Sequence, residues 1–358
     1  MTDAETRLRQ RIAALVDPHH DGALGADAVR ALVIEGRHAA IQIELPYPAR
    51  GWWPQLQQAV LALAREEGLE ASAIDLSTRV RSHSVQQGLQ PLPGVKNIIA
   101  VASGKGGVGK STVAANMALA LQAEGAAVGI LDADIYGPSQ QRMLGLSGQP
   151  DSPDNKRLLP MQAHGLQAMS IGALVGEDTP MIWRGPMVTQ TLQQLLQGTL
   201  WSDLDYLVID LPPGTGDIQL TLAQRVPVAG AVIVTTPQDL ALIDARKALK
   251  MFEKVSVPVL GIVENMATHV CSQCGHEEHI FGSGGGARMA RDYDVPLLGA
   301  LPLDIRIREQ ADGGIPTVAA APDSELAQRY RAIARAAAAR LAQRALNKAI
   351  AFPRIVIE

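Results

Sequence analysis

A glycine-rich turn between an apolar run and a helical stretch contains the first residues that could do chemistry. Residues 98–112 read Ile-Ile-Ala-Val-Ala-Ser-Gly-Lys-Gly-Gly-Val-Gly-Lys-Ser-Thr. The glycines fit two patterns: a dinucleotide fingerprint, with Asp132 about where that pattern has its ribose-binding acid, and a triphosphate-binding loop. In both patterns, backbone N–H groups of the turn and of the following helix bind phosphate oxygens. The turn therefore predicts a nucleotide of either kind.

Lys110 and Ser111 distinguish the two patterns. A lysine at this place puts a point charge between the β- and γ-phosphates, and a hydroxyl completes the shell of a Mg²⁺ ion, whereas a dinucleotide site needs neither. We therefore expect a nucleoside triphosphate, with Ser111 as a magnesium ligand. The residues expected to surround it are Gly104, Lys105, Gly106, Gly107, Val108, Gly109, Lys110, Ser111 and Thr112.

A second apolar run supports the triphosphate interpretation. Residues 206–209 lead into Asp210, the place at which such a protein holds the water of its metal ion, and Leu-Pro-Pro-Gly follows. The backbone N–H of Gly214 could sense a γ-phosphate. The plain alternative is a strand that ends in an aspartate before a proline turn.

Lys105 is unusual because a lysine at the second position of the turn has no use in a minimal phosphate-binding loop. One interpretation is an ordinary surface lysine. The other is a side chain that reaches a neighbouring phosphate in a partner subunit and supplies charge in the transition state, as an arginine finger does.

The sequence contains two cysteines, Cys271 and Cys274, which are separated by two residues. They lie in a glycine-rich loop with His269, His276 and His279 nearby. A redox disulfide is one possibility, although that chemistry is typical of a helix start. Zinc held by both thiolates and two histidines of one chain is a second, although zinc pairs are usually further apart in sequence. A [4Fe–4S] cluster is the third; it ordinarily takes four thiolates, so that two chains would have to share it as a homodimer.

Together these motifs resemble those of a known group of proteins. The segment Lys105-Gly-Gly-Val-Gly-Lys110 resembles the deviant Walker A motif of the MinD/ParA and nitrogenase iron-protein group, and the whole set looks like the Mrp/ApbC family of iron–sulfur cluster carrier ATPases over residues 95–320. The motifs that carry this resemblance are Asp132-Ala-Asp-Ile-Tyr-Gly-Pro-Ser139, Trp183-Arg-Gly-Pro186, Asp210-Leu-Pro-Pro-Gly-Thr-Gly-Asp217, Asn265-Met266 and Cys271-Ser-Gln-Cys274.

The resemblance implies roles for individual residues. Asp134 would position the water that attacks ATP, Asp132 would lie near Mg²⁺, and Asn265, Pro302 and Asp304 would contact adenine. The catalytic residues are then expected to be Lys105, Lys110, Asp134 and Asp210. The implied function is slow ATP hydrolysis used as a switch, with a [4Fe–4S] cluster bridged between two chains and passed to apo iron–sulfur proteins.

The elements that must position these residues follow from the apolar runs. Short buried runs that alternate with helical ones predict an α/β fold, a P-loop NTPase with a doubly wound, mostly parallel sheet. The expected strands and helices of this part are residues 97–102, 113–121, 127–131, 206–209, 229–235, 240–252, 257–263 and 296–301.

The chain of 358 residues is long enough for two units. We expect a small N-terminal α/β domain over residues 1–80, a linker rich in Ser, Gln, Gly and Pro over 81–94, and the ATPase domain over 95–358. In the small domain, Leu8, Ile12, Leu15 and Val16 would face inward from a first helix. Its other elements are expected at residues 28–34, 39–45, 56–63 and 74–80.

Composition excludes several classes of protein. The hydrophobic share of 47%, the charged share of 19% and the net charge of −4 are not those of a disordered tail or a nucleic-acid-binding protein. The first residues do not resemble a secretory signal and no apolar run is long enough to span a membrane, so we expect a cytoplasmic protein without a membrane or nucleic-acid partner.

Two other functions remain as alternatives. One is a partitioning or positioning ATPase that binds a surface through the basic helix expected from Ser324 to about Ala349, although we expect the arginines of this helix to form a solvated outer face. The other is an NAD(P)-dependent oxidoreductase, which would bind reduced nicotinamide and not ATP.

Overall fold

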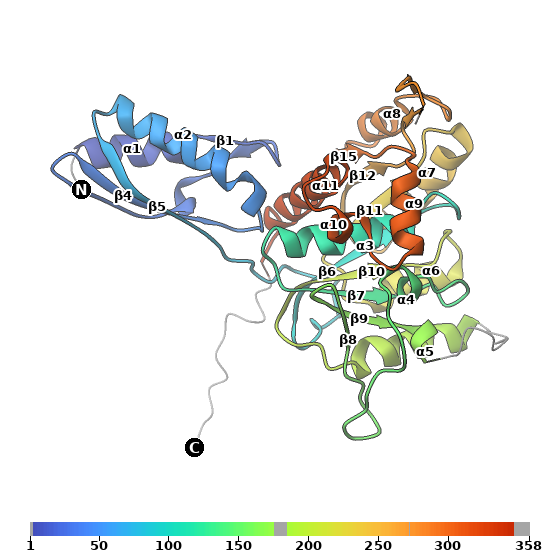
Figure 1. Cartoon of the computed structure of the whole chain (residues 1–358). Helices are drawn as coiled ribbons and strands as arrows, with labels where there is room; N and C mark the ends of the chain where they lie inside the picture. The colour runs from blue at the N-terminus through green and yellow to red at the C-terminus, as the bar shows by residue number, and fades with distance from the viewer. Residues whose placement is uncertain (1–2, 175–184, 272, 347–358) are drawn as a thin grey trace, which may run out of the picture.

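An eight-stranded sheet forms the centre of the larger part of the molecule (Figure 1). The computed structural model describes residues 3–174, 185–271 and 273–346. The strand order is β15-β12-β11-β6-β10-β7-β9-β8, and every neighbouring pair is parallel except β8 with β9. The prediction of a mostly parallel sheet is confirmed. The strands are β6 (Val95–Ala102), β7 (Val128–Asp132), β8 (Met161–Ala163), β9 (Leu166–Ser170), β10 (Leu204–Asp210), β11 (Gly230–Thr235), β12 (Val259–Glu264) and β15 (Leu297–Ala300).

Helices cover both faces of this sheet, as a doubly wound fold requires. Ile99 and Val101 of β6 belong to one buried core, and Ile98 and Ala100 belong to the other, because alternate side chains of a strand point to opposite faces. The first face carries α3 (Lys110–Ala123), α10 (Thr317–Ala320) and α11 (Glu325–Ala342). The second carries α5 (Gly185–Gly198), α6 (Asp217–Arg225), α7 (Asp239–Lys254) and α8 (Gly285–Asp292).

The N-terminal residues build a separate three-stranded sheet in the order β3-β4-β5, with β3 and β4 antiparallel and β4 and β5 parallel. Two helices pack against it (Figure 1). Buried and exposed residues alternate along β4, so that one face of the strand is buried. The elements are α1 (Asp3–Ala13), β1 (Val16–Asp17), β2 (Gly22–Ala23), β3 (Val29–Glu35), β4 (His38–Leu45), α2 (Trp53–Glu66) and β5 (Glu70–Thr78).

One expectation for this N-terminal part is wrong. Val16 does not face inward from the first helix, because α1 ends at Ala13 and Val16 is 75% exposed in β1. Leu8 and Ile12 are fully buried, as predicted. The division into domains at residues 80 and 94 stays a prediction.

The segment expected to be a linker is held against the ATPase part. The Gln86 side chain donates hydrogen bonds to the carbonyl oxygens of Ala223 at 2.8 Å and Val226 at 3.1 Å. His83 is buried and pairs as an isolated bridge with Leu346 near the end of the described chain. This stretch therefore lacks regular structure but is not a free tether.

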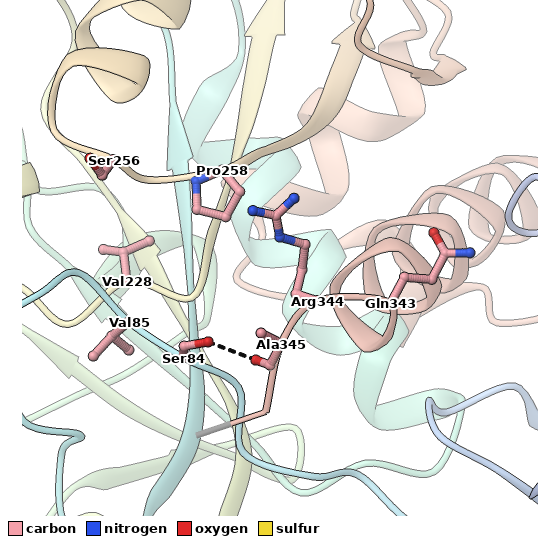
Figure 2. Close-up of a pocket in the computed structure, with 8 residues that line it drawn as sticks. All are labelled: Ser84, Val85, Val228, Ser256, Pro258, Gln343, Arg344 and Ala345. Carbon is pink, nitrogen blue, oxygen red and sulfur yellow. Dashed lines mark hydrogen bonds between the residues drawn. The ribbon is translucent and has the colours of Figure 1, made fainter. Parts of the chain in front are cut away.

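A cavity of about 410 Å³ lies beside this segment (Figure 2). It is bordered by Ser84, whose hydroxyl donates to the carbonyl of Ala345, by Val228, two residues before β11, and by Pro258, directly before β12. Because these are the amino ends of parallel strands, the cavity is on the edge opposite to the one at which α/β proteins bind ligands.

Glu124, just beyond the end of α3, joins three parts of the chain. Its carboxylate is fully buried and accepts hydrogen bonds from Arg331 at 2.7 Å and Arg335 at 2.6 Å, both on α11. It also accepts the backbone N–H of Gly51 at 2.6 Å, from the N-terminal part. Arg335 in turn donates to Nε2 of His19 at 2.9 Å. The N-terminal sheet and the ATPase part are thus fastened by a buried polar network.

This network corrects the expectation for the C-terminal helix. Arg331 and Arg335 are only 15% and 13% exposed and bind Glu124, so they do not belong to a solvated outer face. The helix also ends at Ala342, earlier than predicted, and Lys348 lies outside the described residues. None of the described helices combines the length and the apolar character needed to cross a bilayer.

Replacing Glu124 by Ala is expected to destabilise the protein by about 3–5 kcal/mol, because it leaves two buried guanidinium groups without their carboxylate. Urea unfolding of the full chain would measure this loss. The matched control is Asp21→Ala, which removes the exposed ion pair with Arg340 and should change stability by less than about 1 kcal/mol. Equal losses in the two variants would contradict this role of Glu124.

Candidate functional site

The glycine-rich turn joins β6 to α3 and is shaped by close approaches of its backbone. Gly107 and Gly109 have φ of +79° and +82°, in the left-handed region that favours glycine. A Cβ on Gly104 would lie 2.0 Å from the carbonyl oxygen of Asp244 on α7, so no larger residue fits there. The turn thereby presents backbone N–H groups at the start of α3, as the sequence predicted for phosphate binding.

Lys110, the first residue of α3, is buried among acidic groups. Its Nζ forms an ion pair with Asp210, lies 3.9 Å from Oδ2 of Asp134 and is 3.2 Å from Oγ of Ser111. The structure thus brings Lys110, Ser111, Asp134 and Asp210 together, although they come from three separate stretches of the sequence.

Asp132 and Asp210 occupy directly paired positions at the carboxyl ends of β7 and β10. Both side chains are fully buried. Burial, together with the charge of Asp210, raises the pKa of Asp132 to about 7. The backbone N–H groups of Asp134, Ser139 and Gln140 donate to Asp132 and oppose that rise.

Gln140 is a site residue that the sequence analysis missed. It is the first residue of the short helix α4 (Gln140–Met143) and is buried. Its Nε2 donates to Oδ2 of Asp210 and to the carbonyl of Ser111, both at 2.9 Å. The residue follows Ser139, the last residue of the predicted motif, but an amide carries no spacing rule that would have identified it.

The oxygen atoms gathered here fit a magnesium ion. Ser111, Asp132 and Asp210 supply a hydroxyl and carboxylates, which are the ligands that Mg²⁺ prefers. Oγ of Ser139 and Oε1 of Gln140 are buried and have no hydrogen-bond partner among the residues that the structure describes. Buried oxygens of this kind are the groups that a bound cation or its water would satisfy.

The predicted residues Gly214, Lys105 and Asp134 are less enclosed than Asp132 and Asp210. The N–H of Gly214 donates to the carbonyl of Ser103 at 2.9 Å, so a contact with a γ-phosphate requires this bond to open. Lys105 is exposed on the turn, and Asp134 is 13% exposed. Burial raises the pKa of Asp134, while the charge of Lys110 opposes this effect. The roles assigned to these residues remain predictions.

The residues expected to contact adenine are tied to the protein itself. Asn265 is buried, and its Nδ2 donates to the carbonyl of Val108 in the phosphate-binding turn at 2.9 Å. Asp304 caps α9 (Ile305–Asp312) and pairs with Arg306, which lowers the pKa of Asp304. Pro302, two residues before Asp304, is buried. Contact with a base stays a prediction for all three.

The two cysteines lie on a small hairpin formed by β13 (His269–Val270) and β14 (Glu277–Glu278). Cys271 is partly exposed and Cys274 is exposed. The backbone N–H groups of Cys274 and Gln273 lower the pKa of Cys271, which favours its thiolate. The pair is therefore accessible and chemically suited to bind a metal.

The neighbouring histidines do not complete a metal site within one chain. Nδ1 of His269 is 3.1 Å from the carbonyl of Leu303, and Nδ1 of His279 is 2.9 Å from the carbonyl of Ala267. Across residues 3–174, 185–271 and 273–346, no three His, Cys, Asp or Glu side chains are grouped so that they could hold a metal ion. This arrangement does not support the zinc alternative.

The predicted motif at residues 183–186 is described only in part. Trp183 and Arg184 lie outside the described residues, and Gly185 is the first residue of α5.

Known proteins are similar to this chain over most of its length. A family model described as ParA, NUBPL iron-transfer P-loop NTPase, matches residues 94–338. An iron-sulfur cluster carrier protein from Pseudomonas fragi is 58% identical over 276 residues, 76% of this chain and 96% of that one. Another from Escherichia coli K12 is 55% identical over 303 residues, 84% and 82% of the two chains.

A solved structure is similar in fold as well as in sequence. The nucleotide-binding protein of Archaeoglobus fulgidus, in complex with ADP and with cobalt found in it, has a TM-score of 0.55 and 41% identity. The match covers 62% of this chain and 87% of that one. The family match spans the phosphate-binding turn, the three aspartates and both cysteines.

Proposed function

This chain belongs to the ParA/NUBPL family of iron-transfer P-loop NTPases, and from this premise we propose that it is an ATP-dependent iron–sulfur cluster carrier. The observation that carries the proposal is the accessible pair Cys271 and Cys274, on the loop that follows β12 at the same edge of the sheet as the phosphate-binding turn. An exposed site is suited to a cargo that must be released.

The cargo is a [4Fe–4S] cluster shared by two chains. Such a cluster ordinarily takes four thiolates, and this chain has two cysteines. Two copies related by a two-fold axis would bring four sulfurs together in an isologous interface. The proposed homodimer thus follows from the four thiolates that the cluster needs and the two that each chain supplies. The recipients are apo iron–sulfur proteins.

ATP would bind at the turn before α3. Lys110 would contact the β- and γ-phosphates, and Asp134 would orient the water that attacks the γ-phosphate. Ser111, Asp132 and Asp210 would hold Mg²⁺, which when bound neutralises charge on the phosphates. Lys105, exposed on the turn, would reach the phosphate of the partner subunit.

Hydrolysis would act as a slow switch. The loops after Asp132 and Asp210 contain the hydrogen bonds that a γ-phosphate would replace, among them that of Gly214 to Ser103. Rearrangement of these loops would change how the two chains pair and therefore how firmly four sulfurs hold the cluster.

The alternative of a positioning ATPase that binds a surface through its basic helix has less support. Two arginines of α11 already bind the buried Glu124, so the helix is not a free basic face. We place the protein in the cytoplasm without a membrane or nucleic-acid partner.

Reconstitution with iron and sulfide in the absence of oxygen tests the proposal. We expect about four iron atoms per two chains and a dimer in a mass measurement of the loaded protein. A single chain that keeps its iron, or a tightly bound zinc ion in each separate chain, would contradict the shared cluster.

A further inference from the structure

The loop that holds both cysteines is fixed at its two ends by consecutive residues. Glu264, the last residue of β12, accepts the backbone N–H of Gly286 through Oε1 at 2.6 Å. Asn265 follows, and its Nδ2 donates to the carbonyl of Val108 at 2.9 Å. Both side chains are buried. The two ends of the loop over residues 266–285 are therefore held close together at the end of β12. Asn265, just before the loop, is also bonded to the phosphate-binding turn.

Asn265 holds the most constrained part of that turn. Val108 lies between two glycines with left-handed backbones, and a Cβ on Gly109 would come within 2.2 Å of Nδ2 of Asn265. The carbonyl of Val108 and the N–H of Gly109 belong to one planar peptide group and point in opposite directions. A phosphate that binds the N–H of Gly109 therefore orients the same peptide group whose carbonyl oxygen Asn265 binds.

The chain that follows Asn265 leads to the cysteines. Met266 has φ of +56°, which turns the chain into the loop, and the N–H of Ala267 donates to Leu301 at 2.9 Å. The carbonyl of Ala267 lies 2.9 Å from Nδ1 of His279, across the hairpin. Cys271 directly follows β13, the first strand of this hairpin, and is six residues after Asn265.

We propose that Asn265 is a positioning residue that transmits phosphate binding at the turn to the loop of Cys271 and Cys274. The proposal rests on the function proposed above, since it explains how ATP would alter the hold on a cluster. It gives Asn265 a role distinct from contact with a base, because the bonded partner is the backbone of Val108.

Alkylation of the cysteines in the full-length protein without a cluster tests this role. N-ethylmaleimide would be added without nucleotide, and with ADP or ATP at saturating concentrations with Mg²⁺, and the rate at each thiol followed by mass spectrometry. In the unmodified protein ATP should change the rates. In Asn265→Ala and Asn265→Asp, which cannot donate to Val108, the ratio of the rates with and without ATP should move toward one by about fivefold, the worth of one hydrogen bond.

The matched control is Asn97→Ala. Asn97 is a buried amide on β6 whose Nδ2 donates to the carbonyl of Arg81 at 2.8 Å, and this contact leads neither to the phosphate-binding turn nor to the cysteines. This variant should lose stability but keep the ATP response.

Two results would overturn the inference. One is an unmodified protein in which ATP does not change the alkylation rate of either cysteine. The other is a normal change of the alkylation rates with saturating ATP in both Asn265 variants. Asn265 would then contribute only to the affinity for the base. Failure of the proposed function would show differently, as an unmodified protein that binds no iron on its cysteines.

Discussion

Cys271→Ala combined with Cys274→Ala is expected to remove iron from the reconstituted protein and to weaken its affinity for the cluster by more than about 100-fold. Changes to groups that merely orient a metal ligand already weaken binding by about 10- to 100-fold, and this variant removes every thiolate that the chain offers. Iron and sulfide analysis, with the absorbance spectrum of protein prepared without oxygen, measures the loss. ATP hydrolysis should persist, because neither side chain belongs to the phosphate-binding turn.

The control for this experiment lies in the same hairpin. His276 is exposed, and its backbone carbonyl accepts the N–H of Cys271 at 2.9 Å, a bond that an alanine at this position keeps. His276→Ala should therefore keep its iron if four thiolates of two chains hold the cluster. A loss of metal in His276→Ala as large as in the cysteine variant would instead favour a zinc site made by one chain.

The strands that position the site were predictable because they are buried on both faces. Such strands are continuous runs of Val, Ile and Leu. The predicted run 206–209 lies within β10, and the predicted run 229–235 begins one residue before β11 and ends with it. The edge strand β8 (Met161–Ala163) and its neighbour β9 (Leu166–Ser170) were missed, because they mix polar and apolar residues and β8 is three residues long.

The site was predictable where chemistry requires a residue type at a fixed spacing, as it does for Lys110, Ser111 and Asp210. It was not predictable where a polar side chain finds its partner through the fold. Glu124 looks like a surface acid at a helix end, yet it binds Arg331, 207 positions further along the chain. Gln140 supports Asp210 across 70 positions in the same way. Such pairs leave no local signal, because both partners are ordinary polar residues.

Lys110→Ala is expected to lower the rate of ATP hydrolysis by about 10²- to 10³-fold, the effect of removing one group that stabilises charge in a transition state. Lys110 is 5% exposed and its Nζ contacts Asp210 and Ser111, so its charge is fixed in place before a nucleotide arrives. Phosphate release measures the rate. Lys250→Ala, which changes an exposed lysine on α7, should hydrolyse ATP at the normal rate.

The same variant separates hydrolysis from cluster binding. Removal of Lys110 leaves the buried carboxylate of Asp210 with Gln140 as its remaining side-chain partner among the described residues, next to Asp132, so a loss of stability is expected as well. Lys110→Gln, which keeps a donor without the charge, limits that loss and should also fail to hydrolyse ATP. Both variants should load iron, because within the described part of the chain no hydrogen bond or ion pair joins Lys110 to the cysteine hairpin.

Transfer of the cluster to an apoprotein then decides whether ATP acts as a switch. If hydrolysis drives the change in pairing, loaded Lys110 variants should transfer at one rate with ATP, with ADP and without nucleotide, while the unmodified protein should show different rates. Equal and normal transfer by the Lys110 variants and the unmodified protein under all three conditions would mean that nucleotide does not control release. The cysteines would then carry the cluster independently of the fold's ATPase chemistry, and the bond from Asn265 to Val108 would serve only to hold the turn in place.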